Sequence, residues 1–364
     1  LALLASNQYK KAKARYPNVC GSGLFMEAIE QNPVYYDLAF EMPNHTDSIH
    51  LQGWLAAYAE RRYGAKSAAA EKAWMYLLEG PYRRGTNGTE RSSIVAARPA
   101  LDVKKSGPNA GLGIPYEPML VIQAQAQLLK DADKLAASKP YRFDIVDVQR
   151  QMMTNLGQLV HKKAAEAFVA KDKAAFTLHS RRFLELLSDM DELLYTRSEY
   201  SFDKWLTEAR SWGETKEEKD LMERDATSLV TIWGADGDPR IFDYSWREWA
   251  GLINGYYLPR WQKFYTMLQG HLDAGTDYQE EGLPLAYGRE DFRANDFYNQ
   301  LADWELAYVV QTDKARIPVT RGDELVITRR LFDKYLKLSR EYYTDFSGVE
   351  EIKEERTYEN VGEE

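Results

Sequence analysis

Residues 143–171 read FDIVDVQRQMMTNLGQLVHKKAAEAFVAK, and their apolar residues recur every three or four positions. The apolar stripe contains Ile145, Val148, Met152, Leu156 and Leu159. This spacing places the side chains on one face of a helix, whereas a half-buried strand would alternate apolar and polar residues. The stretch therefore predicts a long amphipathic helix.

Helical periodicity continues on both sides of this stretch. The expected helices span about residues 49–64, 67–79, 116–137, 143–171, 173–195, 202–212, 216–232, 243–271, 290–312 and 323–343. Pro259 is expected to kink or divide the helix over 243–271, because proline cannot donate a helical hydrogen bond. No repeat of fixed length recurs, which argues against a helical solenoid. The pattern predicts an irregular all-α domain over residues 48–345, followed by an acidic tail over 346–364.

The first 47 residues have a different pattern. A helix-like stretch ends near Tyr16, and residues 19–25 suit a short buried strand with a glycine-rich exit. A carboxylate delivered just after such a strand is how a (β/α)8 barrel places catalytic side chains. Glu27 is the candidate, and the alternative is a solvated acid at the start of a helix.

Composition excludes several classes of protein. The 364 residues are 44% hydrophobic and 13% aromatic, which is typical of a globular protein. A net charge of -9 argues against a nucleic-acid partner. No stretch reaches the ~18 consecutive apolar residues of a membrane span. The single Cys20 excludes an internal disulfide and a multi-cysteine zinc site. The histidines at 45, 50, 161, 179 and 271 lack metal spacing, so neither metal nor cofactor is predicted.

Several motifs together resemble one known family. GSGLFMEAIEQN at 21–32 resembles the nucleophile region of glycoside hydrolase family 89, the α-N-acetylglucosaminidases. Further similar motifs follow in the same order along the chain, at 54–64, 142–151, 183–194, 205–210, 231–234 and 243–261. The resemblance covers roughly residues 7–345 and implies that residues 1–47 are the end of a catalytic (β/α)8 barrel.

The resemblance implies a retaining exo-glycosidase that removes terminal α-linked N-acetylglucosamine from glycans, with Glu27 as the nucleophile. A retaining site needs two carboxyl groups ~5 Å apart. In the family the acid/base Glu comes from an earlier barrel strand, which would lie upstream of Leu1. The missing barrel portion is therefore an expected partner, and this chain by itself is expected to be inactive. The family is lysosomal in animals and exported in bacteria, which implies a lysosomal, secreted or periplasmic location.

The resemblance also implies three residues that contact the sugar, namely Trp233, Ile241 and Tyr244. An aromatic face can stack on a pyranose, and a tyrosine hydroxyl can bond a ring hydroxyl. The alternative is that the two aromatic residues belong to the core of a helix hairpin.

Two alternatives to an enzyme stay open, namely a helical carbohydrate-binding or interaction module without catalysis, and a helical scaffold. The long irregular stretch at 81–113 is of a length that is usually functional or disordered.

Overall fold

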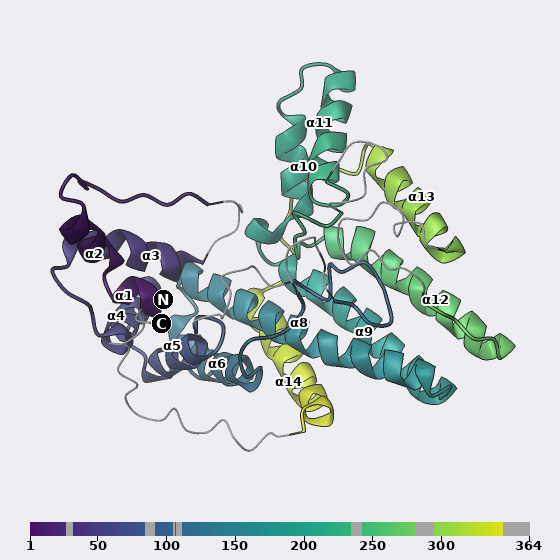
Figure 1. Cartoon of the computed structure of the whole chain (residues 1–364), viewed down its shortest axis with the longest axis horizontal. Coiled ribbons are helices and arrows are strands. Elements are labelled where there is room, and N and C mark those ends of the chain that lie inside the picture. The colour runs from purple at the N-terminus through teal and green to yellow at the C-terminus, as the bar shows by residue number, and fades with distance from the viewer. Residues whose placement is uncertain are drawn as a thin grey trace. The chain divides into compact units, whose positions relative to one another are not determined.

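The structure is a computed structural model, and it describes residues 1–26, 32–83, 92–104, 106, 111–233, 242–280 and 295–344. Within these ranges the chain forms helices joined by irregular segments, and it forms no β-strand beyond isolated bridges (Figure 1). The predicted mainly α class is confirmed. The chain divides into two compact units. Unit 1 contains residues 1–88, 115–148 and 343–364, and unit 2 contains residues 89–114 and 149–342.

Unit 1 is a set of short helices. Those expected over 49–64 and 67–79 begin and end within two residues of the expected bounds, whereas the one expected over 116–137 is divided in two. The helices are α1 (Ala2–Ala5), α2 (Gln8–Arg15), α3 (Pro33–Glu41), the 3-10 helix η1 (Met42–Asn44), α4 (Leu51–Tyr63), α5 (Ala68–Glu79), α6 (Met119–Lys130) and α7 (Ala132–Leu135). Gly64 ends α4 in the left-handed conformation with φ 73°, which glycine adopts without steric cost. The Ser67 side chain accepts a hydrogen bond from the Ala70 N–H and so caps α5. α5 packs against both α4 and α6.

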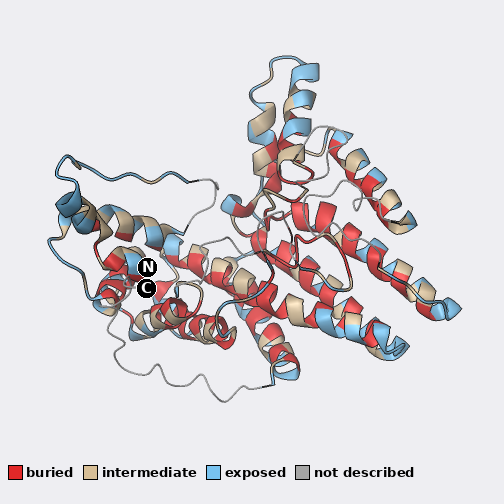
Figure 2. Ribbon diagram, viewed as in Figure 1, coloured by how far each residue is buried: buried red, intermediate tan, exposed pale blue. Residues whose placement is uncertain are grey.

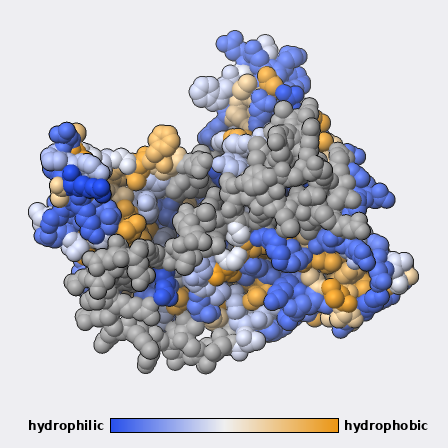
Figure 3. Space-filling view, viewed as in Figure 1, coloured by the Kyte–Doolittle hydropathy of each residue, from blue (hydrophilic) through white to orange (hydrophobic). Residues whose placement is uncertain are grey.

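The expected strand at residues 19–25 is not present. These residues have no strand partner among the described residues, and Phe25 and Met26 have exposed fractions of 108% and 52%. Hydrophobic residues accordingly stand out at the surface after α2 and over α3 (Figure 3). An isolated strand leaves its backbone N–H and C=O groups without ladder partners, so a single extended segment does not form one. The prediction of a buried strand is wrong for this chain, and the barrel fragment stays a prediction.

Unit 2 is built from longer helices. They are the part of α8 (Lys139–Val169) from residue 149 on, α9 (Lys173–Leu194), the 3-10 helix η2 (Ser198–Tyr200), α10 (Phe202–Arg210), α11 (Lys216–Leu229), the π-helix η4 (Ile253–Tyr257), α12 (Leu258–Ala274), α13 (Asp296–Val310) and α14 (Glu324–Tyr342). α9 packs against α12 and α14, and α10 against α11. Figure 2 shows many buried residues along α9 and α12, whereas the outer turns of α10 and α11 are largely exposed.

Part of the long irregular stretch lies inside unit 2. Ile94, Val95 and Ala96 have exposed fractions of 2% or less. Helix side chains satisfy their backbone carbonyl groups: the Trp261 indole N–H donates to the Val95 oxygen at 3.3 Å, and Arg260 donates to the Ala96 oxygen at 2.6 Å. A buried loop needs such partners, because an unpaired buried carbonyl is costly. Residues 93–100 therefore form part of the core, and residues 84–91 lie outside the described residues.

The helix expected over residues 243–271 begins about ten residues later. Gly251 has φ 85°, and its N–H donates to the Asp191 carboxylate at 2.8 Å. The left-handed residue turns the chain, so the preceding segment is irregular and the π-helix follows. Pro259 lies in the first turn of α12, where its missing N–H breaks no hydrogen bond. The π-helix passes into α12 next to Pro259 without an interruption, and the predicted start at residue 243 is wrong.

Candidate functional site

Trp233 and Tyr244 lie side by side in unit 2. Their ring centroids are 4.7 Å apart with an angle of 54° between the ring planes. Both residues are half-buried, so neither is a fully enclosed core residue. We call this pair the aromatic corner. Glu27 and Ile241, the other two predicted site residues, lie outside the described residues.

The backbone on each side of the aromatic corner is held by short hydrogen bonds. The Trp233 N–H donates to the Ser228 oxygen at 2.6 Å, and the Asp243 N–H donates to the Thr231 oxygen at 2.7 Å. Trp233 and Asp243 have φ values of 62° and 56°. Residues other than glycine adopt this left-handed region at an energetic cost, and such residues cluster at functional sites. The chain therefore enters and leaves the corner in a strained conformation.

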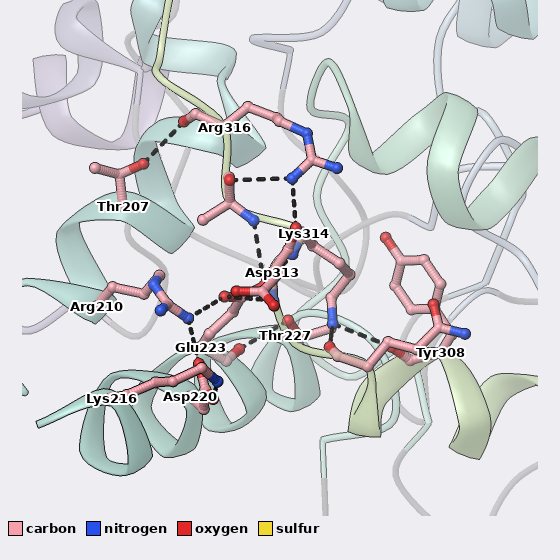
Figure 4. Close-up of polar contacts among 12 residues, drawn as sticks. Thr207, Arg210, Lys216, Asp220, Glu223, Thr227, Tyr308, Asp313, Lys314 and Arg316 are labelled. Carbon is pink, nitrogen blue, oxygen red and sulfur yellow. Dashed lines mark hydrogen bonds and ion pairs between the residues drawn. The ribbon is translucent and has the colours of Figure 1, made fainter.

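The helix that leads into the corner is anchored at Glu223 of α11, which is fully buried. Figure 4 shows its carboxylate facing Arg210, which donates to it at 2.6 Å. The backbone N–H groups of residues 313–315 also donate to this carboxylate, at 2.6 to 3.2 Å. Nearer the end of α11, Thr227 donates to the Glu223 backbone oxygen at 2.8 Å. The bonds to the Glu223 carboxylate fix the middle of α11 to the segment that joins α13 and α14.

The carboxyl group next in sequence to the corner is not available to react with a ligand. Asp243 has an exposed side-chain fraction of 1%, and Arg260 donates to its two oxygens at 3.1 and 3.0 Å. Burial raises the pKa of the Asp243 carboxyl to about 7, although the adjacent Arg260 favours the ionised form. The corner can therefore bind a ring through aromatic faces and a hydroxyl group, but it supplies no accessible carboxylate from Asp243.

Two cavities of unit 2 lie away from the aromatic corner. One has a volume of about 1480 Å³ and is lined by α9, α12 and α13. The other has a volume of about 300 Å³ and is lined by residues that include Phe168, His271 and Tyr278. Neither is lined by the aromatic corner.

Sequence reasoning did not identify the charged partners behind the corner. Arg260 and Glu305 are both fully buried and 3.1 Å apart. The sequence does contain a sign of this pair, namely a charged residue in line with buried apolar residues on one helix face. Glu305 lies four residues from Leu301 and four from Val309, and both of these apolar residues are buried. A buried charge needs a partner, so this pattern predicts an ion pair but does not identify the partner.

Among the described residues no group of three or more His, Cys, Asp or Glu side chains could hold a metal ion. Within the same part of the chain no helix is both long and apolar enough to cross a membrane.

Comparison with known proteins gives one consistent result. Residues 54–334 match the family described as Alpha-N-acetylglucosaminidase (NAGLU) C-terminal domain. Over 343 residues the chain is 32% identical to the Homo sapiens protein Alpha-N-acetylglucosaminidase. That match covers 92% of this chain and 42% of the human protein.

Solved structures from Clostridium perfringens are also similar. A Family 89 Glycoside Hydrolase in complex with 2-acetamido-1,2-dideoxynojirmycin matches with a TM-score of 0.79 and 28% identity, over 91% of this chain and 37% of that chain. A Clostridium perfringens protein in complex with its substrate GlcNAc-alpha-1,4-galactose matches with a TM-score of 0.81 and 27% identity, over 93% of this chain and 38% of that chain. The chain thus spans less than half the length of these relatives.

Proposed function

Since this chain belongs to the family of the α-N-acetylglucosaminidase C-terminal domain, we propose that it is part of a retaining glycoside hydrolase that removes terminal α-linked N-acetylglucosamine. The chain matches 42% of the human relative, so the proposal concerns the whole enzyme to which the chain contributes. The substrate class is supported by the bacterial relative that is in complex with its substrate GlcNAc-alpha-1,4-galactose. We infer the lysosomal or exported location from the same family membership.

The proposed chemistry divides between this chain and the rest of the enzyme. The ionised Glu27 carboxylate attacks the anomeric carbon and forms a glycosyl ester, while a second carboxyl group protonates the departing oxygen. Water then cleaves the ester, with the second group now accepting a proton from that water. We infer that the second carboxyl group comes from the barrel portion outside this chain, to which residues 1–47 would also belong. Glu27 cannot perform these steps alone, which is why the isolated chain is expected to be inactive.

The aromatic corner is the observation that supports a sugar-binding role for unit 2. Two half-buried rings 4.7 Å apart offer a face for the apolar side of a pyranose, and the Tyr244 hydroxyl can bond a ring hydroxyl. Ile241 is proposed as the third contact. The strained backbone at Trp233 and Asp243 agrees with a site whose geometry is set by binding rather than by packing alone.

Two variants of the full-length enzyme test this proposal on an aryl α-N-acetylglucosaminide. Glu27→Gln removes the negative charge but keeps the shape, so kcat is expected to fall by at least about a thousandfold. A kcat within tenfold of the parent would rule out the nucleophile role. Trp233→Ala is expected to raise KM at least about tenfold, since stacked area is lost from the bound state.

The alternative is a carbohydrate-binding or interaction module without catalysis. That alternative predicts sugar binding by residues 48–345 alone and no turnover by the full-length protein. Hydrolysis that depends on Glu27 would exclude it, because a binding module has no nucleophile.

A further inference from the structure

Four charged side chains of unit 2 form a buried cluster behind the aromatic corner. Arg98 comes from the loop 92–104, Asp243 from the segment just before Tyr244 of the corner, Arg260 from α12 and Glu305 from α13. Their exposed side-chain fractions are 9%, 1%, 0% and 0%. Two cations and two carboxyl groups thus meet in the core. We call them the four-charge cluster.

Arg260 is the centre of the cluster. Its Nη1 group donates to both oxygens of Asp243, at 3.1 and 3.0 Å, and to Glu305 Oε1 at 3.1 Å. Its Nη2 group donates to the Ala96 oxygen at 2.6 Å. The guanidinium also lies 4.5 Å from the ring centroid of Tyr256, which belongs to the π-helix. A planar fork with several donors can hold three such partners at fixed angles, whereas a single ammonium group cannot.

Arg98 links the Glu305 carboxyl group to Phe242, which lies close to the corner in the sequence. Its Nη2 lies 3.2 Å from Glu305 Oε2. The same guanidinium lies 5.9 Å from the ring centroid of Phe242 and 5.3 Å from that of Tyr298. Phe242 directly precedes Asp243, so two consecutive residues next to the corner contact cations of the cluster.

We propose that the four-charge cluster positions the aromatic corner for sugar binding, an inference that rests on the function proposed above. Asp243 is bonded covalently to Tyr244, and its N–H is fixed to the Thr231 oxygen two residues before Trp233. A rotation at Asp243 would therefore move one ring relative to the other. The cluster fixes Asp243 from the side-chain direction, and the bond to Thr231 fixes it from the backbone.

The use of charges at this place has a physical reason. Apolar packing of similar volume often stabilises a core as well as a buried ion pair does, so stability alone does not require charges. Apolar contacts are non-directional, whereas charged hydrogen bonds have preferred angles. A left-handed residue such as Asp243 relaxes unless its surroundings determine its conformation. Directional hydrogen bonds from Arg260 fix the conformation of Asp243. Glu305 holds Arg260, and Arg98 contacts Phe242.

The test uses Glu305→Gln in the full-length enzyme, because Glu305 reaches the corner only through other members of the cluster. The matched control is Asp144→Asn in unit 1, where Arg62 donates to a buried Asp144 at 2.7 Å through two nitrogens. Glu305→Gln is expected to raise KM for an aryl α-N-acetylglucosaminide at least about fivefold with kcat within about twofold. Asp144→Asn is expected to leave KM within about twofold, since it removes a similar ion pair in the other unit.

A second measurement separates the cluster from the proposed function. Amide hydrogen exchange, followed by mass spectrometry on peptides that contain Trp233 and Asp243, is expected to accelerate in Glu305→Gln but not in Asp144→Asn. If exchange and KM both stay unchanged, the positioning role is wrong. If exchange accelerates and KM does not rise, the corner is positioned by the cluster but does not bind the sugar, which would refute the function proposed for it.

A milder variant serves if Glu305→Gln does not fold. Arg98→Lys keeps the charge at the most exposed member of the cluster but loses the guanidinium fork. It is expected to raise KM in the same direction by at least about twofold and to accelerate exchange at the same two residues. Parent values for both quantities would contradict the proposal.

Discussion

Replacing Arg260 with methionine removes the centre of the four-charge cluster at little change in volume. The variant leaves two carboxyl groups, Asp243 and Glu305, and the Ala96 oxygen buried without the donor they share. Breaking a buried ion pair by removing one partner costs about 3–5 kcal/mol. A domain of about 150–250 residues loses roughly 2–4 °C of Tm per kcal/mol, so Tm is expected to fall by roughly 6–20 °C.

The loss should depend on pH in a direction that the structure specifies. In the parent, burial already raises the pKa of Asp243 to about 7, above its value in the unfolded chain. The folded state therefore holds a proton that the unfolded state releases between about pH 4 and 7, so this group favours folding at lower pH. Without Arg260 the pKa of Asp243 rises further, and the Arg260→Met variant should lose less stability at about pH 5 than at about pH 8.

The assay is thermal unfolding of the full-length protein at both pH values, followed as Tm, with Arg330→Met as the matched surface control. Arg330 pairs with Glu192 at 2.6 Å, but both side chains are nearly half exposed, at 48% and 49%. Such a pair contributes at most about 1 kcal/mol. A loss in Arg260→Met no larger than that in Arg330→Met would refute the view that the cluster is a coupled buried network.

Three other perturbations test separate parts of unit 2. Burial lowers the pKa of His161 to about 4, so the parent loses stability as the pH falls from 6.5 towards 4, by about 2.5 kcal/mol at about pH 4.5. His161→Phe should lack this loss in urea unfolding. An equal pH dependence in the parent and the variant would contradict the assignment to His161. Glu223→Ala removes the acceptor of the N–H groups at residues 313–315, so trypsin should cleave after Lys314 at least about tenfold faster than in the parent. An unchanged cleavage rate would show that other contacts hold this segment. Gly322 has φ 83°, and an added Cβ would lie 2.4 Å from Ile327 Cδ1. The Ile327 Cδ1 atom ends a side chain that can rotate away. Gly322→Ala should therefore cost the same about 1–2 kcal/mol of left-handed strain as Gly64→Ala, whose Cβ meets nothing within 4 Å, and a much larger loss in thermal unfolding would show that Ile327 cannot move.

The long helices of this chain could be predicted from the sequence because burial imposes a period. Phe176, Phe183 and Leu187 are buried on α9, which spans Lys173–Leu194 against an expected 173–195. The segment before α12 shows the limit of this reasoning. Trp249 and Leu252 are buried as a helical stripe would be, yet an irregular turn at Gly251 buries them. Periodicity reports which residues are buried and not the backbone that buries them.

The candidate site could be predicted only in part. Trp233 and Tyr244 were proposed from the resemblance, since no helical or strand period relates two residues eleven positions apart that share no predicted element. Their contact follows from the hydrogen bond between Asp243 and Thr231. The partners of Arg260 could not be predicted, because Glu305 lies 45 residues away and a single sequence does not reveal which buried charges pair. Resemblance indicated the proposed contact residues, and the structure shows which side chains surround two of them.

The central claim is that Glu27 forms a covalent bond to the sugar during turnover. A slowly hydrolysed, fluorinated α-N-acetylglucosaminyl donor would accumulate the glycosyl ester on the full-length enzyme, and peptide mass spectrometry would locate it. The account predicts one added sugar on the peptide that contains Glu27, absent from Glu27→Gln. A sugar on any other carboxylate, or a competent enzyme that never accumulates an ester, would contradict it.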